Sequence, residues 1–175
     1  EQADHLAVAF DLSAPTFRHK MFDAYKGTRK PMPEELREQV PLMKEVLKTM
    51  EIPIITQAGI EADDILGTIG KEAEEAGFDV AIVSGDRDLL QLATKKVKVK
   101  IPKTKASGTV TEDYYEDDVR ELYGVSPTEF IDMKGLMGDT SDNIPGVPGI
   151  GEKTAAKIIK EYHSIENAHD HIEEI

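Results

Sequence analysis

The chain has 175 residues, of which 39% are hydrophobic and 31% charged, and it contains neither cysteine nor tryptophan. This composition is that of a soluble globular protein with one domain or two small ones, and it excludes a disulfide scaffold, a thiolate metal site and a cysteine nucleophile. The balance of 34 acidic against 21 basic residues gives a formal charge of −13, which disfavours a nucleic-acid partner unless basic residues gather locally.

Two short segments do gather basic residues. Residues 95–105 contain six lysines and no acid, and residues 18–30 contain five lysines and arginines with a single acid. Because local fields decide binding, these segments keep nucleic acid open as a partner. No apolar run reaches the ~18–20 residues of a membrane span and no signal peptide opens the chain, so we expect no membrane partner. The lack of cysteine is compatible with a reducing cytoplasm.

Three short apolar runs alternate with two helical patterns in the first half of the chain. Residues 6–10, 52–56 and 79–83 predict buried strands, and residues 33–50 and 61–77 predict helices. The order strand–helix–strand–helix–strand favours a parallel sheet with right-handed crossovers. Ligand sites in such sheets lie beyond the carboxyl ends of the strands, where this chain carries acidic residues.

The third predicted strand is followed by a short helix and then by a lysine-rich segment. Residues 84–93 predict a short helix with Ser84 or Asp86 as its N-cap. The alternating lysines of residues 96–101 predict an edge strand. We interpret these charges first as a guard of the sheet edge and second as a contact to DNA.

From residue 111 onward the pattern predicts helices only, so we expect an α/β core over residues 1–110 and a helical subdomain over residues 111–175. A glycine-rich stretch at about residues 144–160 predicts a tight hairpin followed by a helix. The glycines that punctuate it are Gly146, Gly149 and Gly151. Glycine lets backbone amides approach a phosphate, and Lys153 adds a positive charge, so the stretch resembles a helix-hairpin-helix that binds duplex backbone. A plain helical corner remains the alternative.

Carboxylates form four clusters along the chain, three of which follow predicted strands. Their members are Asp11; Glu61, Asp63 and Asp64; Asp86 and Asp88; and Asp139 and Asp142. Taken singly, each cluster is explained by helix capping or by a turn. Taken together at one sheet edge, the carboxylates would repel one another unless cations were present. Oxygen donors without cysteine favour Mg²⁺ or Mn²⁺, and their surplus fits two ions, which together cleave phosphodiesters.

These blocks occur together in a known family. Residues 10–36, 59–68, 84–92 and 135–155 resemble, in family order, the 5′-nuclease (5′→3′ exonuclease) domain of bacterial DNA polymerase I and the wider flap endonuclease family. The resemblance implies a PIN-like 5′-nuclease fold, with a mostly parallel central sheet flanked by helices and a C-terminal helix-hairpin-helix subdomain. It also implies hydrolysis of DNA 5′ ends and 5′ flaps at single-strand/duplex junctions, in replication and repair, by a bacterial cytoplasmic protein that is monomeric.

The resemblance also implies roles for individual residues. The residues that match an arch-like segment over the active site are Arg18, Tyr25, Lys26 and Arg29. Lys26 and Arg29 would contact the scissile phosphate, and Tyr25 would stack on a base. All eight carboxylates match metal-binding acids: those at 61–64 together with Asp86 would mainly hold one ion, and Asp88, with those at 139–142, would serve the second. The residues that match the duplex-binding hairpin, where the family often holds K⁺, are Gly146, Gly149, Gly151, Lys153 and Thr154.

One part of the family pattern is missing from this chain. The family's N-terminal strand, which carries a further metal-binding aspartate, does not precede residues 6–10, and we expect those residues and residues 79–83 to lack a partner between them. The second hypothesis is therefore a catalytically incomplete fragment that binds DNA junctions. The third is an unrelated Mg²⁺-dependent phosphatase or receiver-like α/β domain, against which the glycine hairpin and the basic segment argue.

Overall fold

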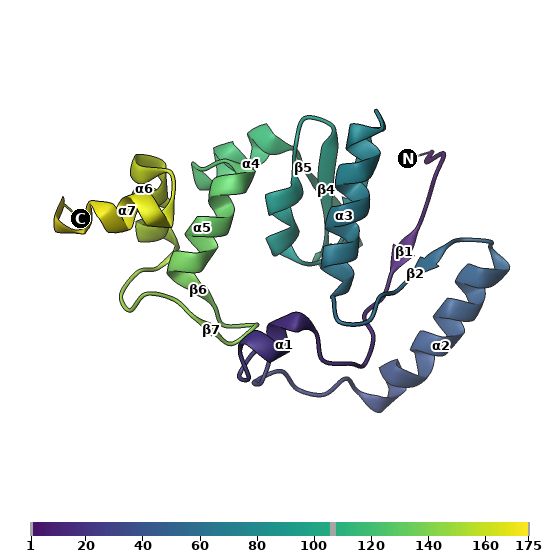
Figure 1. The fold of residues 1–175 in the computed structure, drawn as a ribbon. Helices are drawn as coiled ribbons and strands as arrows, with labels where there is room; N and C mark the ends of the chain where they lie inside the picture. The colour runs from purple at the N-terminus through teal and green to yellow at the C-terminus, as the bar shows by residue number, and fades with distance from the viewer. Residues whose placement is uncertain (1, 106–107, 175) are drawn as a thin grey trace. The chain divides into compact units, whose positions relative to one another are not determined.

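The computed structural model describes residues 2–105 and 108–174 (Figure 1). The chain divides into two compact units. Unit 1 comprises Glu1–Leu66 and Ser141–Asn143, and unit 2 comprises Gly67–Thr140 and Ile144–Ile175. Within the described residues, no helix is both long enough and apolar enough to cross a membrane.

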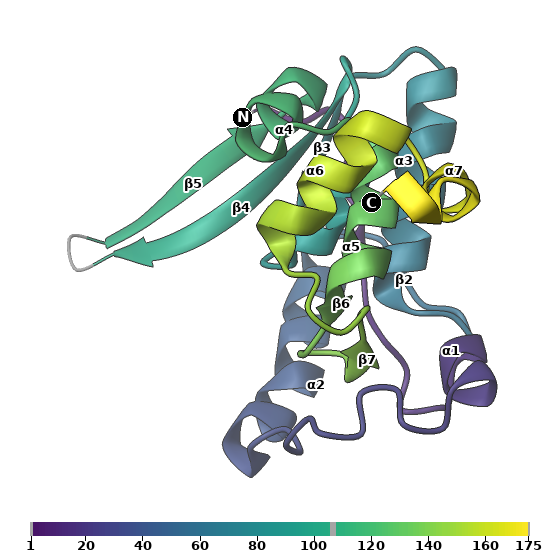
Figure 2. The same cartoon turned by 90° about the vertical axis from the view of Figure 1, so that its left-hand side faces the viewer.

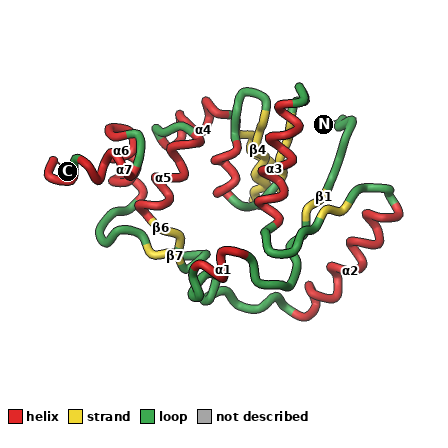
Figure 3. The backbone as a smooth tube through the Cα atoms, in the orientation of Figure 1, coloured by secondary structure: helices red, strands yellow, loops and turns green. Residues whose placement is uncertain are grey.

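Unit 1 is built on a minimal parallel sheet. Strand β1 (Val8–Ala9) pairs with β2 (Ile54–Ile55), and both fall inside the predicted runs 6–10 and 52–56. Helix α1 (Phe17–Met21) has only five residues, and Figure 3 shows loops on either side of it. Helix α2 (Glu34–Thr49) confirms the helix predicted over residues 33–50.

The sheet of unit 2 has the strand order β3-β4-β5. Strand β3 (Val80–Val83) runs parallel to β4 (Val97–Lys105), and β4 pairs in antiparallel fashion with β5 (Gly108–Tyr114). Figure 2 shows β4 and β5 extending together as a long hairpin. Strand β4 is therefore the middle strand, and the prediction of an edge strand over residues 96–101 is wrong.

The lysines of β4 are explained by the strand that was not predicted. Residues 111–114 belong to β5, so the prediction that only helices follow residue 111 is also wrong. Lys100 Nζ lies 2.7 Å from an oxygen of Asp113, and Lys103 Nζ lies 2.6 Å from an oxygen of Glu112. Opposite charges on neighbouring strands stabilise their pairing, so these lysines join two strands and do not guard an edge.

Two helical segments flank strand β3 in the sequence, and each begins with acidic residues. Helix α3 (Ala62–Glu75) confirms the predicted helix over 61–77 and packs closely on β3, since a Cβ added at Gly70 would lie 3.2 Å from the Ile82 side chain. The 3₁₀ turn η1 (Arg87–Leu92) follows β3. Its N-cap is Asp86, the second of the two predicted candidates.

The rest of unit 2 is mainly helical. Its elements are α4 (Glu116–Tyr123), α5 (Pro127–Met137), β6 (Gly138–Asp139), β7 (Ile144–Pro145), α6 (Glu152–Tyr162), α7 (Ile165–Asp170) and η2 (Ile172–Glu174). Helix α5 packs against η1 and α6, and Phe130 and Met133 of α5 are buried, as is Ile159 of α6. Burial of such side chains is the main stabilising contribution to this unit.

A capping box fixes the start of α5. The Ser126 hydroxyl accepts from the Glu129 amide at 3.2 Å, while a Glu129 carboxylate oxygen accepts from the Ser126 amide at 2.7 Å. The other Glu129 oxygen lies 2.7 Å from His163 Nδ1. Burial by itself would raise the pKa of Glu129, but the hydrogen bonds from Ser126 and His163 outweigh burial and lower it.

Replacing Glu129 by alanine is expected to lower the free energy of unfolding by about 1 kcal/mol at pH 7, because the capping box is lost. Since the folded-state pKa lies below the unfolded value of about 4.3, this stabilisation is present above that pH and is lost as the pH falls through the folded-state pKa. Urea unfolding at pH 7 and pH 3 checks this. The exposed Glu161→Ala is the control, and an equal loss at both pH values would contradict the assignment.

Candidate active site

Glu61 lies at the centre of a charged cluster in unit 1. The residue is only 7% exposed, and it directly precedes α3. Its Oε2 atom lies 2.9 Å from Lys26 Nζ and 3.0 Å from the Tyr25 hydroxyl. Arg18 adds a second cation at 3.8 Å. A buried carboxylate needs such partners, and the basic segment 18–30 supplies the cations that compensate the charge of Glu61.

The first turn of α3 is held by two further acids of the predicted set. Both oxygens of Asp64 accept from Arg18, at 2.7 and 2.8 Å, and this paired interaction keeps the pKa of Asp64 below its usual range. An oxygen of Asp11 accepts from the Ala62 amide at 2.7 Å, so Asp11 connects the end of β1 to the start of α3. Asp63 lies half-buried in the same turn.

Asp142 joins the same cluster from a distant part of the sequence. Its Oδ2 atom lies 3.0 Å from the Tyr25 hydroxyl, and Oδ1 pairs with Arg29, which also donates to the Ser141 carbonyl. Burial, reinforced by hydrogen bonds to Asp142 and Glu61, raises the pKa of the Tyr25 hydroxyl, which therefore acts as a neutral donor. Tyr25 is only 6% exposed, so its ring is not presented to solvent as the predicted base stacking requires.

The acids of unit 2 begin at the carboxyl end of β3. Asp86 Oδ1 accepts from the Asp88 amide at 2.9 Å and so caps η1. The Asp88 carboxylate pairs with Lys134, in the last turn of α5. Burial raises the pKa of Asp88; neighbouring Asp86 and Asp139 add to the rise, while Lys134 opposes it.

Lys134 is the residue of this cluster that sequence reasoning missed. Its Nζ atom lies 3.0 Å from Asp88 Oδ1 and 2.7 Å from Asp139 Oδ2. Burial alone would lower the pKa of Lys134, but the hydrogen bonds to Asp139 and Asp88 outweigh burial and raise it. The available signal was a single lysine in the last turn of α5, five residues before Asp139, which is too common a pattern to stand out.

The glycine-rich hairpin follows in unit 2 and has the predicted form. Strands β6 and β7 bring Gly138 opposite Pro145, and Gly149 adopts a left-handed conformation with φ of 86°. Gly151 is the N-cap of α6, so a helix follows the hairpin as predicted. Lys153 and Thr154 are exposed in the first turn of α6, beside backbone amides that have no partner within the helix.

The structure thus places five of the eight carboxylates in unit 1 and three in unit 2. The unit 1 members are Asp11, Glu61, Asp63, Asp64 and Asp142, and the unit 2 members are Asp86, Asp88 and Asp139. No group of three or more acidic or histidine side chains within metal-binding reach occurs among residues 2–105 and 108–174. The donors are nonetheless oxygen atoms of the kind that Mg²⁺ prefers, and side-chain ammonium and guanidinium groups already lie against them as cations. The chemistry of the donor atoms therefore suits a hard divalent ion, and the coordination of the ion would have to be completed by water or by phosphate oxygens.

Comparison with known families accounts for the whole chain. Residues 1–124 match the family described as "5′-3′ exonuclease, N-terminal resolvase-like domain", and residues 125–175 match "5′-3′ exonuclease, C-terminal SAM fold". The chain is 51% identical over 175 residues to DNA polymerase I of Bacillus caldotenax and 50% identical to DNA polymerase I of Bacillus subtilis. The match covers 100% of this chain and 20% of each relative, so the chain spans a fifth of their length.

Solved structures show the same fold. A bacteriophage T5 protein co-crystallised with metal ions is 30% identical, with a TM-score of 0.78 over 96% of this chain and 65% of that one. The flap endonuclease of bacteriophage T5 in a complex with DNA and metal ions is 30% identical, with a TM-score of 0.76 over 96% of this chain and 64% of that one. These likenesses confirm the mixed α/β fold with a C-terminal helical part.

Proposed function

Because the chain belongs to the 5′-3′ exonuclease family, we propose that it hydrolyses DNA phosphodiesters at 5′ ends and 5′ flaps with the help of two divalent ions, Mg²⁺ or Mn²⁺. The observation that carries the proposal is the set of carboxylates, whose only donor atoms are oxygens. Four of them lie 2.7–3.0 Å from a lysine or arginine nitrogen: Glu61, Asp64, Asp88 and Asp139. The carboxylates of such a site bind hard cations, and its lysines and arginines bind phosphate groups.

In this proposal the carboxylates divide between the two ions. One ion is held mainly by Glu61, Asp63, Asp64 and Asp86, and the other is served by Asp88, Asp139 and Asp142. When bound, such ions activate a water molecule and stabilise the leaving oxygen of the cleaved phosphodiester. Lys26 and Arg29, which here pair with Glu61 and Asp142, then donate to the scissile phosphate, because a phosphate oxygen is an equivalent anionic acceptor.

The hairpin supplies the duplex contact in this proposal. Gly149 adopts a left-handed conformation in the turn and Gly151 caps α6, and the 11 residues of this helix direct the positive end of its dipole toward that turn. Lys153 and Thr154 add a charge and a hydroxyl for the same phosphate. We include a K⁺ ion at this hairpin in the proposal. The flap endonuclease of bacteriophage T5 in its complex with DNA supports a DNA substrate for the fold.

A second candidate function is binding of DNA junctions without cleavage. It is favoured by one observation, the absence of a three-residue metal cluster among the described parts of the chain. A band shift of junction DNA that needs no metal, together with no cleavage product, would select this candidate.

The proposed function is tested with an end-labelled 5′-flap duplex in Mg²⁺ or Mn²⁺, compared with EDTA. Short 5′ products that require the metal are expected, and Asp139→Asn is expected to slow their formation by about a hundredfold, since a ligand charge is lost. Asp117→Asn, an exposed change of the same kind on α4, is the matched control. A folded protein that yields no product would refute the nuclease proposal.

A further inference from the structure

Lys134 has no role in the proposed reaction, yet it makes the central contacts among the acids of unit 2. Its ammonium is shared between Asp88, on η1, and Asp139, in β6, at 3.0 and 2.7 Å. The two carboxylates are separated by 51 positions in the sequence, and the lysine comes from the α5 helix between them. One side chain therefore connects two elements that each carry a proposed metal ligand.

The ion pair between Lys134 and Asp139 is partly buried. The Lys134 side chain is 24% exposed and that of Asp139 is 15% exposed, so both ends of the pair are partly removed from water. Charge pairs in such positions are screened less than pairs on the surface. Helix α5 is anchored by buried Met133 and Leu136 on either side of Lys134, which directs the lysine side chain toward η1.

The Lys134 ammonium and a bound divalent ion would use the same carboxylate oxygens of Asp88 and Asp139. An ammonium group is a compact point charge that donates up to three hydrogen bonds to carboxylate oxygens. A divalent ion bound by Asp88 and Asp139 would need the lone pairs that Lys134 now uses, and a positive charge that stayed in place would repel it.

We propose that Lys134 is a positioning residue that acts as an internal counter-cation. It holds Asp88 and Asp139 within reach of one cation in the absence of metal, and it competes with the divalent ion for their oxygens. The inference rests on the proposed role of these two acids as metal ligands. Its consequence is that Lys134 sets the metal concentration at which the unit 2 acids become occupied.

Lys134→Met removes the competing charge and keeps a side chain of similar length. The metal-free variant is expected to melt at a lower temperature than the unsubstituted protein, because Asp88 and Asp139 then repel each other. Its Kd for Mn²⁺ is expected to fall about tenfold, since a full positive charge no longer opposes the ion. The rise in melting temperature on adding Mn²⁺ is expected to be larger than for the unsubstituted protein, as ligand linkage requires.

The experiment is calorimetric titration of MnCl₂ into the protein without DNA, together with melting curves. Asp139→Asn identifies which binding step belongs to this pair. Lys134→Arg, which keeps the charge, is expected to restore a Kd near that of the unsubstituted protein. If Lys134→Met does not fold, Lys134→Gln is used in its place, since it removes the charge and keeps hydrogen bonding.

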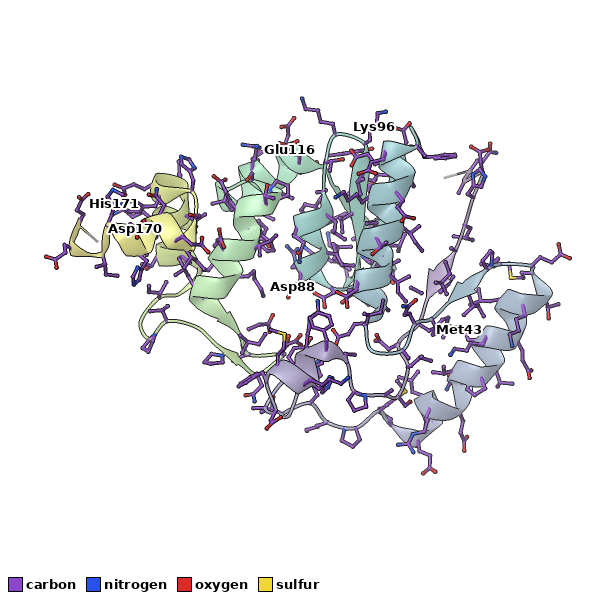
Figure 4. All side chains as sticks on the ribbon, in the orientation of Figure 1. Met43, Asp88, Lys96, Glu116, Asp170 and His171 are labelled. Carbon is purple, nitrogen blue, oxygen red and sulfur yellow. The ribbon has the colours of Figure 1, made fainter. Side chains whose placement is uncertain are left out.

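Lys96→Met is the matched control. Lys96 is exposed, and it directly precedes β4, beside the amino end of β3 and away from its carboxyl end. Figure 4 shows Lys96 and Asp88 at opposite ends of this part of unit 2. The control removes the same charge and is expected to leave the Kd unchanged.

Two results would overturn the proposal. A Kd for Mn²⁺ that is unchanged or weaker in Lys134→Met, with normal binding by the unsubstituted protein, refutes the competition and leaves the metal site standing. No binding of Mn²⁺ that depends on Asp139 refutes the assignment of these acids as ligands, and the inference falls with it.

Discussion

Glu61→Gln is expected to reduce the rate of 5′-flap cleavage about a thousandfold while the protein remains folded. Glu61 is the most buried acid of the unit 1 cluster, and one of its oxygens lies within 3.0 Å of both Tyr25 and Lys26. Glutamine has the same shape but no charge, so a divalent ion loses an anionic ligand and the Lys26 ammonium loses its partner. Loss of about 4 kcal/mol of transition-state stabilisation corresponds to this change in rate.

The rate is measured in single-turnover reactions with Mg²⁺, and the fold is checked by the melting temperature. A loss of about 2 kcal/mol in the free energy of unfolding accompanies the substitution, because a partly buried ion pair is broken. Glu45→Gln on the exposed face of α2 is the matched control within unit 1. A Glu61→Gln protein that cleaves within tenfold of the unsubstituted rate would remove Glu61 from the reacting centre.

Gly146→Ala is expected to lower the free energy of unfolding by about 3 kcal/mol or more and to abolish binding of duplex DNA. A Cβ at this position would collide with the Met137 carbonyl group and lie 2.6 Å from the Gly138 nitrogen. The obstructing atoms belong to the backbone of the α5 end and β6, so no side chain can move aside. The hairpin must open to admit the methyl group, and the turn that precedes α6 is displaced with it.

Gly151→Ala provides the matched comparison for stability. The added Cβ would meet no atom within 4 Å, and the backbone of Gly151 has a φ of −97°, which alanine adopts without strain. Its melting temperature is therefore expected to stay close to that of the unsubstituted protein. Equal destabilisation by both substitutions would show that the close approach at Gly146 does not hold the hairpin together.

The elements that depend on local sequence were predictable. Helix α3 begins and ends within a few residues of its predicted limits because its apolar spacing and the left-handed Gly77 are properties of the segment itself. The cap of η1 by Asp86 and the start of α6 after Gly151 have the same local origin. The glycine hairpin was found because its backbone requires glycine at fixed positions.

The position of β4 in its sheet could not be read from the sequence of β4. Alternating lysines are typical of an edge strand, but here they pair with Glu112 and Asp113 of a strand that begins at Gly108. Pairing between strands depends on a partner elsewhere in the chain, so only the tertiary structure shows that these opposite charges meet.

The candidate site, too, was only partly predictable from the sequence. Residue type and the family pattern made all eight carboxylates and the basic residues Arg18, Lys26 and Arg29 candidates from the sequence alone, and they stay predictions. The partner of each acid was decided by folding, since the Tyr25–Asp142 contact joins residues 117 positions apart and the Lys134–Asp88 contact joins distant elements. Sequence determines which charges are present, whereas the packing of helices and strands decides which of them compensate one another, because Coulomb interactions depend on distance in space.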